Sequence, residues 1–354
     1  DDPKWEQFID QLTLDDMVGA VDEYFGTKAV EAVFKPETRF ADGPGGISGP
    51  YLPDKSAFTG VANSDGIKGS GTAYVGEAVA ASQWNKEMIA QRGYFIAEDA
   101  LFCGVTQAWA PASDLHRSPF GGRIFEYYSE DGVLAGYLAM NQVNGAVSKG
   151  VYPYVKHFAV NDQETNRESF LLTFVSEQAM REIYLKPFEI CIKGLEGGSM
   201  AVMTSYNWLG SVPACANSDL LQTVLRDEWG FRGMAITDYD GSYGYMISEN
   251  CVRNGNDLML GYGNAASNQF PNQSATGTLA MRNACKNIMY TIVNSGAYAG
   301  DENPVGGKSN MDKLFMKVNV TAGAVIGVIA ILVLVRALLK RKKMKAAEAE
   351  NAAK

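Results

Sequence analysis

The chain has 354 residues, of which 46% are hydrophobic and 20% charged, so a large folded core is expected and global disorder is not. Its net charge is −9, and this acidic balance argues against nucleic acid as the main partner. The five cysteines are widely spaced and there are only two histidines, a pattern that favours buried free thiols over a metal site. No metal and no cofactor are therefore expected.

The first part of the chain predicts helix followed by loop. Residues 5–21 have the pattern of an amphipathic helix, which the start signal Thr13-Leu-Asp-Asp16 can divide into two short helices. Residues 41–75 are rich in glycine, proline and serine and predict a long loop, a feature that is often functional in compact domains. From residue 74 onward the predicted elements alternate, with helices at 84–100, 132–149, 169–193 and 218–228 and strands at 105–110, 151–159, 200–206, 234–237 and 257–260.

Alternating strands and helices joined by short turns predict a parallel sheet with right-handed crossovers. The number of segments and a length of roughly 250–300 residues favour a TIM-type (β/α)8 barrel over an open doubly wound sheet. No glycine-rich nucleotide-binding fingerprint follows a predicted strand. The expected fold class is thus α/β, with the barrel at residues 1–299.

The end of the chain predicts a membrane anchor. Residues 320–335 are an uninterrupted run of apolar and small residues, and a spanning helix of about 20 residues is reached if Arg336 extends toward the headgroups. The cluster Lys340-Arg-Lys-Lys343 follows, and positive residues stay cytoplasmic. We expect a cell-membrane protein with an extracellular barrel, a linker at 300–317, one transmembrane helix at 318–339 and a basic cytoplasmic tail at 340–354. The alternative is a buried soluble helix.

Polar residues stand where two strand-like runs end. Lys156 and His157 end the run that begins near Val151, and Asp238 follows the run that begins at Gly233. In a parallel barrel such residues share one rim, where active sites are built. Taken singly, each has an ordinary interpretation: a solvated loop acid, a lysine extended from a strand end and a core histidine.

Five motifs, in order and spread over residues 5–297, together resemble glycoside hydrolase family 3, which includes many β-glucosidases. They are Ala41–Gly46, His116–Asp131, Tyr154–Arg167, Met203–Asn207 and Leu220–Asp238. The resemblance implies that Asp238 is the nucleophile and that the sugar is held by Asp42, Arg123, Lys156, His157, Met203, Tyr206 and Tyr239. The chain departs from the family where Tyr239 replaces the usual tryptophan, and where Ile47 and Ser48 stand in place of a frequent arginine.

The resemblance implies a retaining, exo-acting hydrolase that removes a terminal β-D-glucosyl or similar residue from a β-glucoside or oligosaccharide. The family places its general acid outside the barrel, often on a companion α/β sandwich domain, and no acid motif of that kind is evident here. We therefore expect the acid outside this chain, on a sandwich domain upstream of Asp1 in a reversed domain order. The alternative is a membrane-anchored, non-catalytic carbohydrate-binding protein. A metal-dependent barrel hydrolase is disfavoured by the two histidines.

Overall fold

The computed structural model describes residues 2–22, 26–48, 71–240, 244–261 and 274–298, together with Arg336. The chain divides into two units, Asp1–Gly307 and Lys308–Lys354. The predicted linker and tail lie outside the described residues, and so does the predicted transmembrane helix apart from Arg336. Among the described residues, no helix combines the length and the apolar character needed to cross a membrane.

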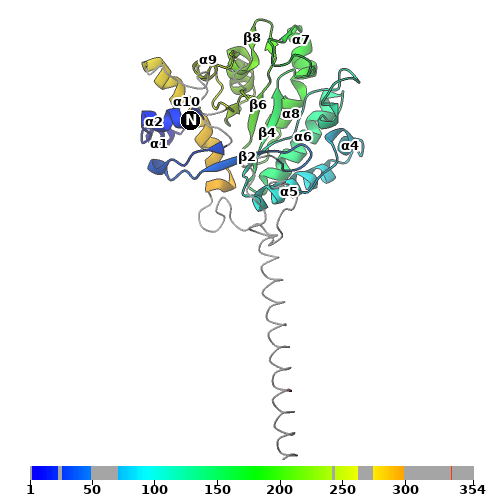
Figure 1. The fold of residues 1–354 in the computed structure, drawn as a ribbon, viewed down its shortest axis with the longest axis horizontal. Helices are drawn as coiled ribbons and strands as arrows, with labels where there is room; N and C mark the ends of the chain where they lie inside the picture. Colours follow the sequence, from blue (N-terminus) through cyan, green and yellow to red (C-terminus); the bar gives the residue numbers. More distant parts are fainter. Residues whose placement is uncertain are drawn as a thin grey trace, which may run out of the picture. The chain divides into compact units, whose positions relative to one another are not determined.

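A parallel sheet forms the centre of the first unit (Figure 1). Five strands hydrogen-bond to one another in chain order, all parallel: β2 (Thr38–Asp42), β3 (Gln107–Trp109), β4 (Tyr152–Phe158), β6 (Ala201–Thr204) and β9 (Ala235–Ile236). A short strand, β1 (Gly26–Thr27), pairs antiparallel with β2. Beyond β9, residues 258–261 continue the parallel order through two isolated bridges, from Ile236 to Leu258 and from Asp240 to Gly261.

Helices cover one face of this sheet. They are α4 (Glu77–Ala81), α5 (Lys86–Phe102), α6 (Gly132–Val147), α8 (Lys186–Lys193) and η5 (Asp219–Glu228), the last with wide π-type turns. The main cluster joins Val155, Val202 and Ala235 of the strands to Leu138, Phe188 and Leu221 of the helices. Two of these helices, α5 and α6, begin at a capping residue. The side chain of Asn85 accepts a hydrogen bond from the Met88 N–H, and the side chain of Asp131 accepts from the N–H groups of Val133 and Leu134.

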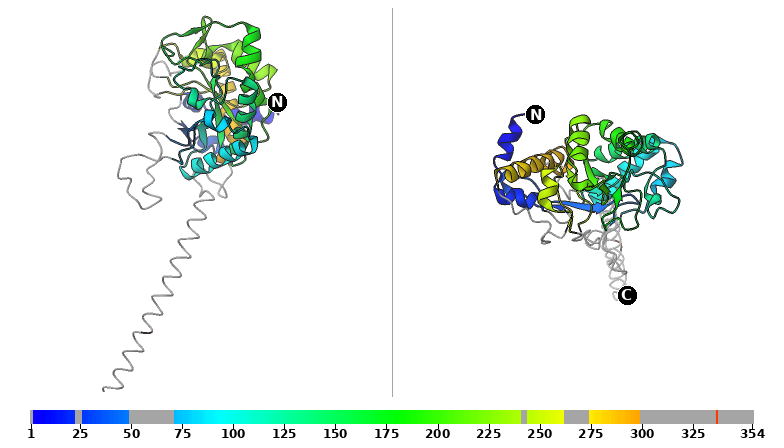
Figure 2. Two further views of the ribbon diagram at one scale, coloured as in Figure 1. Left: turned by 90° about the vertical axis from the view of Figure 1, so that its right-hand side faces the viewer. Right: turned by 90° about the horizontal axis from the view of Figure 1, so that it is seen from above.

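The long helix α10 (Ala275–Val293) covers the opposite face of the sheet. Side chains alternate along a strand, so Tyr152 and Tyr154 of β4 point away from Val155, and both pack with Ile288 and Ile292 of α10. The same helix packs against α1 (Lys4–Ile9) and α2 (Leu14–Val21), which lie beside it in Figures 1 and 2. The first and last described α-helices of the unit are therefore neighbours.

The predicted α/β architecture is confirmed as TIM-like, but the predicted count of eight strands is not reached within the described residues. There, five parallel strands and one bridged segment are present. The aromatic and aliphatic side chains on the inner face are covered by α10, and in the described part no further strand covers them.

The predicted helix at 169–193 is wrong over its first third. Helical structure begins only with α7 (Glu177–Ala179), and it continues through η3 (Met180–Tyr184) into α8. Residues 172–173 instead form β5, which pairs with β7 (Trp208–Leu209), itself paired with β8 (Val212–Pro213). Two features explain the difference: Phe170 has a φ of 58°, and its ring packs against Trp208 and Tyr245.

The other predicted elements differ mainly at their ends. The predicted helix at 5–21 is two helices, α1 and α2, separated by the Thr13 cap, whose hydroxyl accepts from the Asp16 N–H. The first two residues of the predicted loop at 41–75 belong to β2. Its residues 49–70 lie outside the described residues. All five cysteines are free and buried as predicted, and the sulfurs of Cys215 and Cys251 lie 3.6 Å apart.

Candidate active site

A cavity of about 880 Å³ opens at the carboxyl ends of the parallel strands. The structure brings all eight predicted site residues to its wall: Asp42, Arg123, Lys156, His157, Met203, Tyr206, Asp238 and Tyr239. They come from β2, β4, β6 and the segments that follow β3, β6 and β9. This grouping follows from a parallel sheet, in which strand ends far apart in the sequence meet at one edge.

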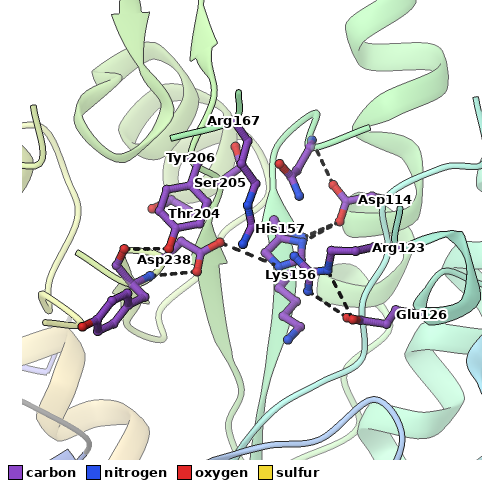
Figure 3. Close-up of polar contacts among 12 residues, drawn as sticks. Asp114, Arg123, Glu126, Lys156, His157, Arg167, Thr204, Ser205, Tyr206 and Asp238 are labelled. Atoms are coloured by element: carbon purple, nitrogen blue, oxygen red, sulfur yellow. Dashed lines mark hydrogen bonds and ion pairs between the residues drawn. The ribbon is translucent and has the colours of Figure 1, made fainter. Parts of the chain in front are cut away.

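Asp238 stands two residues beyond β9, and only one of its carboxylate oxygens is engaged. Oδ1 accepts a 2.7 Å hydrogen bond from the Tyr239 N–H. Oδ2 makes no hydrogen bond within the described residues, and it lies 3.8 Å from Nε2 of His157 (Figure 3). The side chain is 12% exposed. The carboxylate is therefore held by its backbone neighbour, while Oδ2 is buried without a hydrogen bond beside His157.

Burial raises the pKa of Asp238 above its ordinary value, because a charged carboxylate loses hydration in the cavity wall. The positive charges of Arg167, Arg123 and Lys156 and the Tyr239 N–H act in the opposite direction without cancelling the effect of burial. The group thus combines a partly desolvated oxygen with nearby cations that favour its ionised form.

His157 lies between two carboxyl groups. Its Nδ1 is 2.8 Å from Oδ2 of Asp114, and its Nε2 faces Asp238 (Figure 3). The pKa of His157 is lowered well below its ordinary value by burial, and further by the charges of Arg123, Lys156 and Arg167. The imidazole is therefore neutral at ordinary pH, and each ring nitrogen has a fixed neighbour.

Lys156 and Asp42 face each other across the cavity. The lysine Nζ lies 3.5 Å from Oδ1 of Asp42, whose side chain is 55% exposed. The loop after β2 is closed by backbone hydrogen bonds in both directions between Asp42 and Ser48. A side chain at Gly43 would meet the Ala110 Cβ at 2.7 Å, so the Asp-Gly-Pro sequence lets this loop approach the next strand end.

Arg123 is already paired in this structure. Its guanidinium donates two hydrogen bonds to Glu126, at 3.2 and 2.8 Å, and lies 3.7 Å from Glu164. Burial acts to raise the pKa of Glu126, but the Arg123 bond and the charges of Lys156, Arg123 and Arg167 outweigh it and lower the pKa. Glu126 is consequently an ionised partner of Arg123, which makes it a poor proton donor.

Two aromatic residues, Tyr206 and Tyr239, flank Asp238. The Tyr206 hydroxyl donates a 2.7 Å hydrogen bond to the Tyr239 carbonyl, which ties the loop after β6 to the loop after β9. Met203 of β6 lies buried in the same wall. An aromatic side chain is thus retained at position 239 although the indole usual in the family is absent.

Three further residues of this region were not predicted as site residues, although Arg167 ends one of the five motifs. Arg167 lines the cavity and its guanidinium lies 4.7 Å from the centre of the Tyr206 ring. Trp109, the last residue of β3, also lines the cavity. Asp114 contacts Nδ1 of His157, the ring nitrogen that does not face Asp238. The available signals were the polar loop after His157 for Arg167 and the strand-end position of Trp109, whereas Asp114 gave no such signal.

Within the described ranges, no cluster of three or more His, Cys, Asp or Glu side chains could hold a metal ion. The cavity wall instead presents paired cations, carboxylates and aromatic rings. Such a wall suits a neutral ligand rich in hydroxyl groups, since each hydroxyl can both donate and accept a hydrogen bond.

Comparison with known proteins decides the family. Residues 57–258, more than half of the chain, match the sequence model of the Glycosyl hydrolase family 3 N terminal domain. The chain belongs to glycoside hydrolase family 3. Family 3 relatives include Beta-glucosidase B of Emericella nidulans, 35% identical over 241 residues, and Beta-glucosidase A of Butyrivibrio fibrisolvens, 36% identical over 239 residues. These alignments cover 67% and 68% of this chain but 26% of each relative, so the chain spans about a quarter of their length.

Solved family 3 structures agree with the observed fold. Beta-glucosidase 3B from Thermotoga neapolitana, in complex with alpha-D-glucose, superposes with a TM-score of 0.72 at 31% identity, over 88% of this chain and 45% of that one. Beta-glucosidase from Kluyveromyces marxianus, in complex with glucose, gives a TM-score of 0.70 at 28% identity, over 82% and 34%. The TIM-like α/β fold is therefore that of the family 3 N-terminal domain.

Proposed function

We propose that this chain is the nucleophile-bearing domain of a retaining, exo-acting glycoside hydrolase that removes a terminal β-D-glucosyl or similar residue. The observation that carries the proposal is the Asp238 carboxylate, which lines a cavity at the strand ends and whose Oδ2 is buried without a hydrogen bond within the described residues. Attack by this carboxylate forms a bond to the anomeric carbon while the glycosidic C–O bond breaks. Water then cleaves the covalent intermediate with net retention.

The remaining wall residues are proposed to hold the sugar. Lys156 and Arg123 supply donors, whereas Asp42 supplies an acceptor. Hydrogen bonds of this kind can strengthen as positive charge develops on the sugar ring, which stabilises the transition state. The cavity of about 880 Å³ lies in the range of small-molecule sites. Tyr206 and Tyr239 offer apolar ring surface beside the nucleophile.

The general acid is proposed to lie outside this chain, on a companion α/β sandwich domain. The described cavity wall contains three acids besides Asp238, and each already contacts a cation. Asp42 lies 3.5 Å from Lys156, Glu126 is hydrogen-bonded to Arg123, and Glu168 lies 3.7 Å from Arg167. A group outside the chain would leave these pairs intact while it protonates the departing oxygen.

The stereochemical course tests the proposed function. Proton NMR during hydrolysis of an aryl β-glucoside by the 354-residue chain should show β-glucose as the first product, followed by slow mutarotation. A first product of α configuration would rule out double displacement. Sugar binding without turnover would instead support a carbohydrate-binding protein that uses the same cavity.

The pH dependence of catalysis should reflect the buried nucleophile. Asp238 must be ionised to attack, so activity is present above its pKa and is lost as the pH falls through it. Because burial raises that pKa above 3.8, the acidic limb of kcat/KM should lie above the range of an exposed aspartate. Arg167→Gln should move this limb to higher pH, since Arg167 is the main cation opposing the effect of burial.

A surface control separates this effect from a general loss of charge. Arg181 pairs with Glu228 outside the cavity, so Arg181→Gln should leave the pH profile in place. An acidic limb that moves to lower pH in Arg167→Gln would contradict the assignment.

We also propose that residues 318–339 anchor the protein in a cell membrane, with the barrel outside and the tail at 340–354 in the cytoplasm. The support is the apolar run at 320–335 followed by the basic cluster at 340–343. Alkaline washing of membranes should leave the protein in the pellet, and protease added to intact cells should reach the barrel. Release by the wash would refute the anchor.

A further inference from the structure

Asp114 is a buried carboxyl group outside the cavity wall. It lies in the segment between β3 and α6, five residues after the last residue of β3, and its side chain has no exposure. All of its hydrogen-bond contacts go to the segment that follows Lys156. Asp114 Oδ2 accepts from the His157 N–H at 2.9 Å, and Oδ1 accepts from the Asn161 N–H at 3.0 Å. One side chain thus ties both ends of residues 157–161.

The third contact of Asp114 is to the His157 ring, at 2.8 Å from Nδ1. The ring is held on another side by Tyr127, whose own ring packs edge-on with centroids 6.4 Å apart. Nε2 is then the nitrogen that points at Asp238 (Figure 3). Asp114 and Tyr127, which do not line the cavity, therefore set the orientation of the imidazole. The Nε2 edge of the ring faces the cavity.

The donors around Asp114 indicate where the ring proton lies. Backbone N–H groups can only donate, so both carboxylate oxygens act as acceptors, and a carboxylate held in this way can accept a further hydrogen from Nδ1. A neutral imidazole has one donor and one acceptor. With Nδ1 as the donor, Nε2 is left as an acceptor toward the cavity.

We propose that Asp114 is a positioning residue that fixes the tautomer and the orientation of His157, so that Nε2 faces the cavity as an acceptor beside Asp238. Resting on the proposed function, this arrangement presents Nε2 as an acceptor 3.8 Å from the Asp238 carboxylate. A hydroxyl group of a sugar ring can donate to this acceptor. A ring that lacks this hydroxyl loses the hydrogen bond.

A competing arrangement has a protonated Asp114 that donates to Nδ1 and leaves Nε2–H toward the cavity. The pKa of Asp114 is raised well above its ordinary value by burial and by the nearby Asp162 carboxyl, which outweigh the hydrogen bonds from the His157 and Asn161 N–H groups and the charge of Arg123. The two arrangements differ in which ring nitrogen carries the hydrogen. Nitrogen NMR of the imidazole distinguishes them directly, without any need for turnover.

The experiment uses the 354-residue chain in detergent with ¹⁵N-labelled histidine. Only His116 and His157 contribute, and His157→Gln assigns the signals. His116 is an internal reference of the opposite tautomer, because its Nε2 donates to the Tyr127 carbonyl at 2.8 Å. We expect His157 to carry its hydrogen on Nδ1. A wild-type spectrum with hydrogen on Nε2 of His157 overturns the proposal, even if no variant folds.

Asp114→Asn tests the positioning role. The new amide can donate to Nδ1, so the hydrogen of His157 should move to Nε2, and glucose affinity measured by titration should fall by on the order of 10- to 100-fold. The matched control is Asp162→Asn, a neighbouring buried carboxyl that accepts from the Leu115 N–H. It should leave tautomer and affinity unchanged. An unchanged tautomer in Asp114→Asn overturns the proposal. A wild-type protein with the expected tautomer that fails to bind glucose counts against the proposed function instead.

Discussion

Asp238→Ala is expected to reduce kcat for an aryl β-glucoside by at least roughly 10³-fold, because the covalent intermediate can no longer form. Within the described cavity wall, Asp238 is the acid with a buried oxygen that makes no hydrogen bond. The sugar contacts proposed for Lys156 and Asp42 would remain, so KM should change much less than kcat. Steady-state kinetics on the variant measure both values.

Rescue by azide makes this test specific. The alanine leaves space beside the anomeric carbon, and azide can attack there to give a glycosyl azide of α configuration. Asp227→Asn is a matched control, since Asp227 is an exposed acid on η5. Normal turnover by Asp238→Ala, or a β-configured azide product, would remove Asp238 from the nucleophile role.

The second large effect concerns the leaving group. The 354-residue chain should hydrolyse cellobiose more slowly than an activated aryl glucoside by on the order of 10²–10⁴-fold, the usual contribution of general acid catalysis. An activated phenolate departs without a proton, whereas the glucose oxygen of cellobiose requires one. The physical basis is that every acid of the described wall except Asp238 already contacts a cation.

Two variants show whether an acid of this chain contributes. Glu168→Gln should leave the ratio between the two substrates unchanged, because Glu168 is not expected to donate the proton. Glu126→Gln should lower activity on both substrates alike, since it removes the partner of Arg123. A Glu168→Gln protein that loses cellobiose hydrolysis while it retains the activated substrate would place the acid within this chain.

The cavity could be predicted from sequence because it depends on strand ends. Lys156, His157 and Asp238 each follow a short apolar run, and parallel strands bring the ends of such runs to one edge whatever their separation along the chain. Asp114 gives no such signal. Its importance depends on the contact with His157, which lies 43 positions away and is made by folding.

The parts that sequence could not predict are those in which tertiary contacts override local preference. Residues 169–176 contain the apolar spacing of a helix start, yet Phe170 packs on Trp208 and the chain there becomes extended. Helix α10 is comparable, because its amphipathic pattern does not reveal that Ile288 and Ile292 lie against the inner face of the sheet.

The contact between the two ends of the first unit has a consequence for how such a domain can be connected. Trp5 of α1 packs on Tyr290 of α10 with ring centres 6.0 Å apart, and Glu6 pairs with both Arg282 and Lys286. Helices α1 and α10 are thus held together on one side of the unit, away from the strand ends that form the cavity. A neighbouring module could be fused at either terminus from nearly the same starting point. The order of two such modules along the chain could then be exchanged without changing the strand ends that line the cavity.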